Sequence, residues 1–197
     1  MNTTDYKAII KPFLSEKRYL HSVNVAKEAV YLANRYGADP QKAEVVGILH
    51  DIMKDTPPEE QLKIMMRFDI ILTDVERNAQ KLWHAMCGAA YIEQELHIID
   101  CDILNAVRYH TTGRANMTQL EKVIFIADFI SADRDYDGVE RMRKAAESSL
   151  EQAMLEGVVF TIQDLSQRFK PIHPDTVSAY NWVVLDYEDK ITSKNDL

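Results

Sequence analysis

Helix-start signals recur along this chain, and the apolar residues between them repeat at intervals of three and four. Capping boxes of the form Ser/Thr-x-x-Glu stand at 56–59, 73–76 and 118–121, and a version led by Asp stands at 137–140. Only six glycines and six prolines interrupt the 197 residues, and there is no clear strand segment. The sequence therefore predicts an all-α fold, built as a compact bundle of many helices.

The first two predicted helices are the best defined. Apolar residues along one face predict a helix over 18–36 that ends at Gly37. Asp39 then supplies an N-cap, and Pro40 the first position, of a strongly apolar helix that continues through 43–53. Further helices are expected at 81–96, 102–110, 139–154 and 176–187, joined by short loops.

Length and composition predict one soluble domain that spans residues 1–197. The length lies within the single-domain range, and the 46% of hydrophobic residues are spread along the chain, so no segment resembles a disordered arm. Near the N-terminus no apolar run approaches the roughly 20 residues that cross a bilayer. The first eleven residues also lack a signal-peptide pattern. These features predict a cytoplasmic protein.

Charge and cysteine content limit the expected partners. The net charge of −8 repels a phosphate backbone, so neither nucleic acid nor an anionic membrane is an expected partner. A small phosphorylated ligand stays open, because a local cluster of metal ions and cationic side chains can outweigh the overall charge. Cys87 and Cys101 lack the spacing of a zinc ribbon or a disulfide scaffold. They are expected to be buried thiols in a reducing compartment.

Two apolar segments contain ionisable residues that need a partner. His50 and Asp51 are adjacent within one predicted helix, and Asp128 lies within another. Burying an ionised carboxylate is costly unless a partner compensates it, and a divalent cation is the most economical partner for this set. For Asp128 taken alone, an ion pair with Arg108 or Arg134 is an equal alternative.

The other histidines extend this candidate site. His21 lies at the edge of the first apolar stripe, where the alternative is a half-buried ring with one hydrogen bond, and His84 and His110 lie near predicted helix ends. Imidazoles and carboxylates together suit Fe, Mn, Zn, Co or Ni, and six such ligands can hold two ions, which indicates phosphorus chemistry. His97 is expected to cap a helix or lie on the surface. His173, between two prolines, is expected to contact a ligand or to form a stiff turn.

The pattern formed by His21, His50, Asp51 and Asp128 resembles the H…HD…D signature of HD-domain metal-dependent phosphohydrolases. Further motifs are similar to the YqeK-type branch over about 11–187, the expected core of a single HD domain. These motifs are His50-Asp51-Ile52-Met53-Lys54, Trp83-His84, His110-Thr111-Thr112-Gly113, Ala127-Asp128-Phe129-Ile130-Ser131-Ala132-Asp133-Arg134 with Tyr136, Gly138 and Val139, and His173-Pro174.

The resemblance implies an HD-domain helical bundle with the metal site in a central cleft. That branch is described as cleaving bis(5′-nucleosyl) tetraphosphates symmetrically with a di-iron site, diadenosine tetraphosphate above all, which gives two ADP. Manganese, cobalt, zinc and nickel are the alternative metals. The implied metal ligands are His21, His50, Asp51, His84, His110 and Asp128.

The expected mechanism is attack by a metal-activated hydroxide at a two-metal site. Asp51 or Asp128 would accept the proton of the attacking water, and Asp51 is preferred. Lys54, one helical turn after His50, and Arg134 would neutralise phosphate charge. The alternatives are a surface lysine at a helix end and an arginine paired with a neighbouring aspartate. The expected nucleotide or phosphate contacts are His21, Asn24, Asp51, Lys54, Arg134, His173, Pro174 and Asn181.

Three other functions remain open from the sequence. One is an HD-type hydrolase that acts on nucleoside triphosphates, guanosine polyphosphate alarmones, cyclic nucleotides or nucleoside monophosphates. The second is oxygen activation, because a di-iron site of histidines and carboxylates also suits that chemistry. The third is a sensor that binds nucleotide or metal without catalysis. The sequence also leaves open a homodimer.

Overall fold

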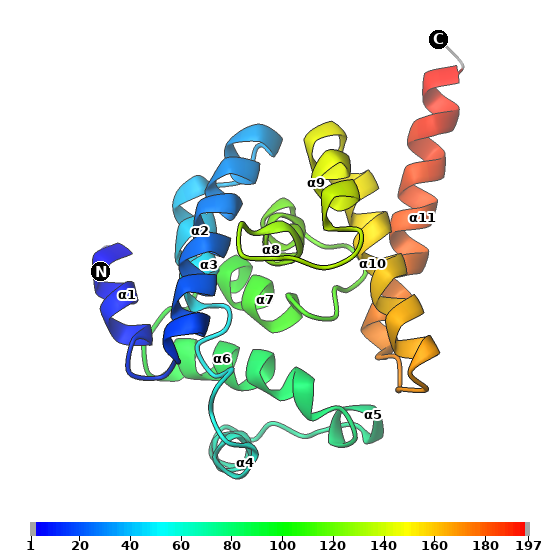
Figure 1. Cartoon of the computed structure of the whole chain (residues 1–197). Helices are drawn as coiled ribbons and strands as arrows, with labels where there is room; N and C mark the ends of the chain where they lie inside the picture. Colours follow the sequence, from blue (N-terminus) through cyan, green and yellow to red (C-terminus); the bar gives the residue numbers. More distant parts are fainter. Residues whose placement is uncertain (1–2, 196–197) are drawn as a thin grey trace.

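The computed structural model describes residues 3–195, which form eleven α-helices and one short 3₁₀-helix (Figure 1). No segment in this range is a strand, so the predicted all-α class is confirmed. Within the same range, no helix combines the length and the apolarity needed to cross a membrane. The elements are α1 (Thr3–Ile10), α2 (Glu16–Tyr36), α3 (Pro40–Leu49), α4 (Pro58–Arg67), α5 (Asp74–Arg77), η1 (Gln80–Leu82), α6 (Trp83–Gln94), α7 (Cys101–Tyr109), α8 (Gln119–Ile130), α9 (Val139–Ser148), α10 (Leu150–Gln167) and α11 (Pro174–Asn195).

Helices α2 and α3 are separated by the caps that the sequence predicts. Gly37 ends α2 with a φ of +78°, a left-handed conformation that glycine adopts without strain. Asp39 caps α3 by accepting hydrogen bonds from the backbone N–H groups of Gln41 and Lys42, and Pro40 occupies the first helical position. The tight turn folds α3 back so that it packs along α2.

Helix α3 ends just before His50, short of its predicted end. The ring is the cause, because its Nδ1 atom donates to the carbonyl oxygen of Gly47 at 2.8 Å. That carbonyl is the acceptor that the N–H of Asp51 would need to continue the helix. Helix α7 ends in the same way, with His110 Nδ1 donating to the carbonyl oxygen of Val107 at 2.7 Å. His50 therefore stands at a helix end and not inside a helix, whereas His110 stands at the helix end that the sequence predicts.

Helix α8 occupies the centre of the bundle in Figure 1. It packs against α2, α3, α7, α9 and α10, and its residues 120–127 are all buried. The predicted capping box fixes its start, because the Thr118 side chain accepts from the N–H of Glu121 and the Glu121 carboxylate accepts from the N–H of Thr118. This central helix carries Asp128 in its last turn.

Helices α2 and α3 approach most closely at Gly47. A Cβ atom placed there would lie 2.4 Å from the Cα atom of Ala26 on α2, a separation that real structures do not show. Only glycine permits this backbone contact. Because His21 lies on α2 and His50 follows α3, the contact at Gly47 helps to bring these two histidines together.

The C-terminal half departs from the predicted helix over 139–154. Ser149 has an extended backbone, with φ −159° and ψ 132°, and separates α9 from α10. Its hydroxyl accepts a hydrogen bond from the N–H of Gln152 and so caps α10. The single predicted helix is therefore two, and α10 continues to Gln167, well beyond the predicted end.

Two of the four predicted capping boxes, those led by Thr73 and Thr118, are confirmed. The box at 56–59 is wrong, because two consecutive prolines set the start of α4 instead. The box led by Asp137 is also wrong, because Gly138, with a φ of +100°, is the residue that precedes α9. Backbone constraints at proline and glycine override the side-chain signal at both places.

The two cysteines occupy different environments. Cys87 lies buried in α6, as predicted, and burial raises the pKa of its thiol to about 12. Cys101 is exposed at the first position of α7, so the prediction of a buried thiol is wrong for this residue.

Candidate metal centre

Six side chains from five helices or their ends meet in the interior. Five of them are almost completely buried, and the sixth, Asp128, has a side chain that is 17% exposed. The structure thus brings together every metal ligand that the resemblance implies. These are His21 from α2, His50 and Asp51 from the end of α3, His84 from α6, His110 from the end of α7 and Asp128 from α8.

The four imidazole rings form a row in the order His84, His110, His50 and His21. Neighbouring ring centroids along this row are 5.1, 5.0 and 5.5 Å apart. The Oδ1 atom of Asp51 lies 3.1 Å from the Nε2 atom of His84 and 3.5 Å from that of His110. Its Oδ2 atom lies 3.8 Å from the Nε2 atom of His50. Asp51 is therefore within reach of three of the four rings.

Asp128 lies at the His21 end of the row. Its Oδ1 atom is 2.9 Å from the Nε2 atom of His21. Arg134 binds the same carboxylate, and its Nε atom donates to the backbone carbonyl of Asp128 at 2.7 Å. The pair between Asp128 and Arg134, one of the alternatives from the sequence, is therefore present beside the cluster.

Hydrogen bonds at the outer ring nitrogens orient three of the histidines. His50 and His110 donate their Nδ1 protons to main-chain carbonyl groups, which leaves the Nε2 atom of each ring directed toward the interior. The Nδ1 atom of His21 lies 2.8 Å from the Oδ2 atom of Asp133, whose Oδ1 atom accepts from the amide of Asn24. Such outer partners fix the tautomer and the direction of histidine ligands at metal sites.

Burial keeps two of the rings neutral. It lowers the pKa of His50 to about 4, although the carboxylate of Asp51 opposes the shift. Burial also lowers the pKa of His84 to about 4, against a hydrogen bond with Asp51. For His21 burial acts in the same direction, but the hydrogen bond and charge of Asp128 outweigh it and raise the pKa.

The two carboxylates are held in the ionised form. Burial alone would raise the pKa of Asp51, but the neighbouring imidazoles and the ammonium group of Lys54 hold it well below its usual range. Burial of Asp128 is likewise outweighed, there by the hydrogen bond from His21 and the charge of the nearby arginine. Ionised carboxylates are the form that coordinates a metal ion.

The cluster passes a simple test of fit to metal ions. Two buried atoms at its centre, His50 Nε2 and Asp51 Oδ1, have no hydrogen-bond partner within the described part of the chain. Leaving such atoms unsatisfied costs roughly 1–3 kcal/mol each, and coordination would remove that cost. The donor set suits Fe, Mn, Zn, Co or Ni. Three overlapping groups have ligand atoms within 4.8 Å of one another, namely His21, His50 and Asp51, then His50, His110 and Asp128, and then Asp51, His84 and His110.

Three cationic side chains border the cluster. Lys54 places its Nζ atom 3.1 Å from the Nε2 atom of His84 and 3.6 Å from the Oδ1 atom of Asp51. Arg18 places a guanidinium nitrogen 3.5 Å from the Oδ2 atom of Asp51, and Arg134 binds at the opposite end of the row. The three side chains are 27%, 33% and 33% exposed, so each contacts both the cluster and the solvent.

Arg18 is a residue that the sequence analysis missed. It precedes His21 by three positions on α2, so the two side chains share a helix face. The spacing of three positions from His21 is the sequence signal that indicates Arg18. Asp133 is a second such residue, because the sequence shows only that it precedes Arg134, whereas the structure shows its contact with His21.

Several other predicted residues lie outside the cluster. The Nε2 atom of His173 is 3.4 Å from the Oε1 atom of Glu76 on α5, which fits the predicted turn before α11. Pro174 begins α11 and Asn181 lies exposed along it. Contacts between these residues and a nucleotide stay predictions. His97 is exposed, as expected, with a φ of +57°.

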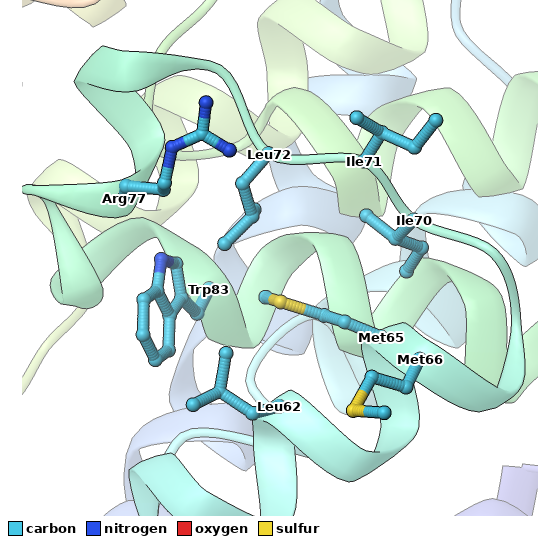
Figure 2. A pocket seen from close by; sticks show the side chains of 8 residues that line it. All are labelled: Leu62, Met65, Met66, Ile70, Ile71, Leu72, Arg77 and Trp83. Atoms are coloured by element: carbon cyan, nitrogen blue, oxygen red, sulfur yellow. The ribbon is translucent and has the colours of Figure 1, made fainter.

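An apolar pocket of about 500 Å³ lies between α4, α5 and α6 (Figure 2). Figure 2 shows the side chains of Leu62, Met65 and Trp83 directed toward one another, and Arg77 is the charged residue of the lining. The lining contains no histidine, cysteine or carboxylate. Metal or acid–base chemistry is therefore assigned to the six-residue cluster and not to this pocket.

The metal-free protein is expected to lose stability as the pH falls, mainly through His50 and His84. Each ring has a pKa of about 4 when folded and 6.5 when exposed, so between these values the unfolded chain binds the additional protons. The free energy of unfolding should be fully retained above pH 6.5. It should fall toward pH 4 by on the order of 1–3 kcal/mol per pH unit.

Urea unfolding of the metal-free protein at pH 7, 6 and 5 measures this dependence. His21 changes the stability in the opposite direction, because its pKa is raised in the folded protein. Its contribution to the free energy of unfolding is present below pH 6.5 and is lost as the pH rises through the raised pKa. A His84→Gln variant should show a shallower fall than the wild type. Equal stability at the three pH values would contradict the low pKa values of His50 and His84.

Comparison with known proteins places this geometry in a family. The HD domain family model matches residues 18–133, a range that contains all six clustered side chains. A crystal structure from Clostridium acetobutylicum, described as an HD superfamily hydrolase involved in NAD metabolism, is similar with a TM-score of 0.90 and 35% identity. The similarity covers 94% of this chain and 98% of that one, so the two proteins share the helical fold over nearly their whole lengths.

Three relatives named as symmetrical bis(5′-nucleosyl)-tetraphosphatases match nearly end to end. The Bacillus subtilis protein is 43% identical, over 93% of this chain and 98% of its own length. The Halalkalibacterium halodurans protein is 41% identical, over 94% and 99%. The Staphylococcus aureus protein is 35% identical, over 96% and 97%. The chain therefore belongs to the HD domain family, in the branch of the symmetrical bis(5′-nucleosyl)-tetraphosphatases.

Proposed function

We propose that this protein is a metal-dependent hydrolase that cleaves diadenosine tetraphosphate symmetrically into two ADP. The observation that carries the proposal is the buried cluster of four imidazoles and two carboxylates, which contains two atoms without partners in the described part of the chain. The relatives that share nearly the whole chain support the choice of substrate through the activity in their names.

The cluster is proposed to hold two metal ions, with iron as the native metal and manganese, cobalt, zinc or nickel as alternatives. When bound, the ions supply positive charge at the phosphate oxygens and lower the pKa of the attacking water. The row of rings supports two positions, because the ligand groups overlap and extend along it. One position would be held by His21, His50, Asp51 and Asp128, and the other by Asp51, His84 and His110.

Asp51 is the proposed acceptor of the proton from the attacking water. Asp128 is engaged by His21 and by Arg134, whereas the Oδ1 atom of Asp51 lacks a hydrogen bond within the described residues. The carboxylate of Asp51 also lies nearest the middle of the row, in reach of three rings. A base in that position can reach a water on either side of it.

The cationic side chains support cleavage of a bond that has phosphates on both sides. Lys54 lies at the His84 end of the row, Arg134 lies at the His21 end, and Arg18 lies beside Asp51 between them. Each is partly exposed, so it can exchange its present carboxylate or ring partner for a phosphate oxygen. A tetraphosphate chain cut at its centre would meet positive charge along both halves.

Replacing Lys54 by alanine is expected to lower kcat/KM by roughly 10- to 100-fold while the protein keeps its metal. The ammonium group lies beside the cluster, but nitrogen and oxygen atoms of other residues form the ligand groups. Steady-state kinetics and metal analysis of the same preparations test this. Lys63→Ala removes a lysine that is 68% exposed and pairs with Glu60, and should behave like the wild type. Unchanged kinetics in Lys54→Ala would contradict the role.

The proposed substrate is tested by a panel of phosphorylated compounds. Metal-free protein is reloaded with iron, manganese or cobalt and given diadenosine tetraphosphate, diadenosine triphosphate, ATP and a guanosine polyphosphate in parallel. The proposal expects turnover only after reloading, and the highest kcat/KM for diadenosine tetraphosphate. Equal or faster turnover of ATP or of the guanosine polyphosphate would contradict the assigned substrate. Turnover by the chelated protein would contradict the assigned chemistry.

A further inference from the structure

His21 differs from His50 and His110 in the partner of its Nδ1 atom. The Nδ1 atoms of His50 and His110 face neutral main-chain carbonyl groups. The Nδ1 atom of His21 faces a carboxylate instead, with the Oδ2 atom of Asp133 at 2.8 Å. A carboxylate partner makes a histidine a more basic and more rigid metal ligand than a carbonyl partner does.

The carboxylate of Asp133 is held on both of its oxygens. Its Oδ1 atom accepts a hydrogen bond from the side-chain amide of Asn24 at 3.1 Å, while its Oδ2 atom faces His21. Asn24 lies three positions after His21 on α2, so the ring and the amide share one helix face and both contact the same carboxylate. Asp133 follows the end of α8, five positions after Asp128. The hydrogen-bonded set links α2 to the segment that leaves α8.

The two ends of the imidazole row also differ in charge. The His21 end contains the carboxylates of Asp128 and Asp133 and one cation, Arg134. The His84 end carries the ammonium group of Lys54 and shares with the first position only the carboxylate of Asp51, which is 3.6 Å from that ammonium group. The end with two carboxylates therefore carries the more negative local charge, which favours a divalent cation there.

We infer that Asp133 is a positioning residue that acts through His21 and makes the cation position at His21 and Asp128 the tighter of the two. The inference rests on the proposed function, since it assumes a two-metal centre. Asn24 takes part by holding Asp133 in place, which gives this residue a role other than the nucleotide contact expected from the sequence. Partners of this kind change metal affinity by about 10- to 100-fold when they are removed.

Cobalt(II) titration of the full-length, metal-free protein tests the inference without relying on activity. Asp133→Asn keeps the size of the side chain and an acceptor oxygen but removes the charge, and Asp133→Ala removes the acceptor as well. The tighter of two binding phases should weaken by about 10-fold in Asp133→Asn and by up to about 100-fold in Asp133→Ala. The weaker phase should be unchanged in both.

The matched control is Asp135→Asn, which neutralises an exposed aspartate two positions further along the same segment. Its two phases should equal those of the wild type, and urea unfolding should show that all variants are folded. The inference is overturned if Asp133→Asn binds cobalt like Asp135→Asn, or if its weaker phase is the one that changes. A wild-type protein that binds no cobalt, or a single ion, overturns the two-metal proposal and this inference with it. If the wild type shows two cobalt-binding phases and Asp133→Asn shows the same two, this inference alone is overturned.

Discussion

An Asp51→Ala protein should contain no bound metal and should hydrolyse diadenosine tetraphosphate at least about 10³-fold more slowly than the wild type. Asp51 is the carboxylate that reaches His84, His110 and His50, so it belongs to both proposed cation positions. Its loss leaves three imidazoles near one another without the negative charge that offsets bound cations. Metal binding and turnover should therefore fail together.

Metal analysis and single-turnover kinetics on the same preparation measure both effects of Asp51→Ala. Asp74→Ala is the matched control, because that carboxylate on α5 is 94% exposed and lies outside the cluster. It should retain the metal content and the rate of the wild type. A metal-free Asp51→Ala protein that still turns over substrate would contradict the metal-dependent mechanism.

The second large effect is expected from Gly47→Ala, which should lower the free energy of unfolding by about 3 kcal/mol, the upper end of the cost of overpacking a core. The added methyl group would lie 2.4 Å from the Cα atom of Ala26, and backbone atoms cannot move aside as a flexible side chain can. Helices α2 and α3 must separate to relieve the contact. Because the carbonyl of Gly47 also holds the ring of His50, metal affinity should fall as well.

Gly88→Ala provides the matched control for that substitution. A Cβ atom on Gly88 in α6 would have its nearest neighbours at 3.5 Å and 3.6 Å, both side-chain methyl carbons in ordinary contact. Alanine is a better helix former than glycine by roughly 1 kcal/mol, so this variant should be as stable as the wild type or more stable. Urea unfolding and cobalt titration measure both variants. A Gly47→Ala protein as stable as Gly88→Ala would contradict the close packing of α2 on α3.

The sequence was sufficient to identify the charged part of the site that lies in apolar segments. Asp51 and Asp128 stand among hydrophobic residues, and burial of a carboxylate demands a partner whatever the tertiary structure is. His84 and His110 were less certain from residues alone, because a single buried histidine is often only a hydrogen-bonded core residue. Their residue type and their places near helix ends made them candidates, the resemblance to a family implied them as ligands, and the structure places both beside Asp51.

Other features could not be obtained from local sequence signals. The helix end at His50 arises because its ring competes for a main-chain carbonyl, a choice that depends on what surrounds the ring. The contacts of Arg18 with Asp51 and of Asp133 with His21 join residues far apart in the chain. Helical periodicity predicts which face of a helix is buried, but it does not predict which partner that face meets.

The most direct test of the central claim is the identity of the products. Metal-loaded wild-type protein is given diadenosine tetraphosphate, and the nucleotides are separated by anion exchange at early and late times. Attack at the centre of the tetraphosphate, with cations along both halves, predicts ADP as the sole product from the first time point, two for each substrate molecule. AMP together with ATP would contradict the account.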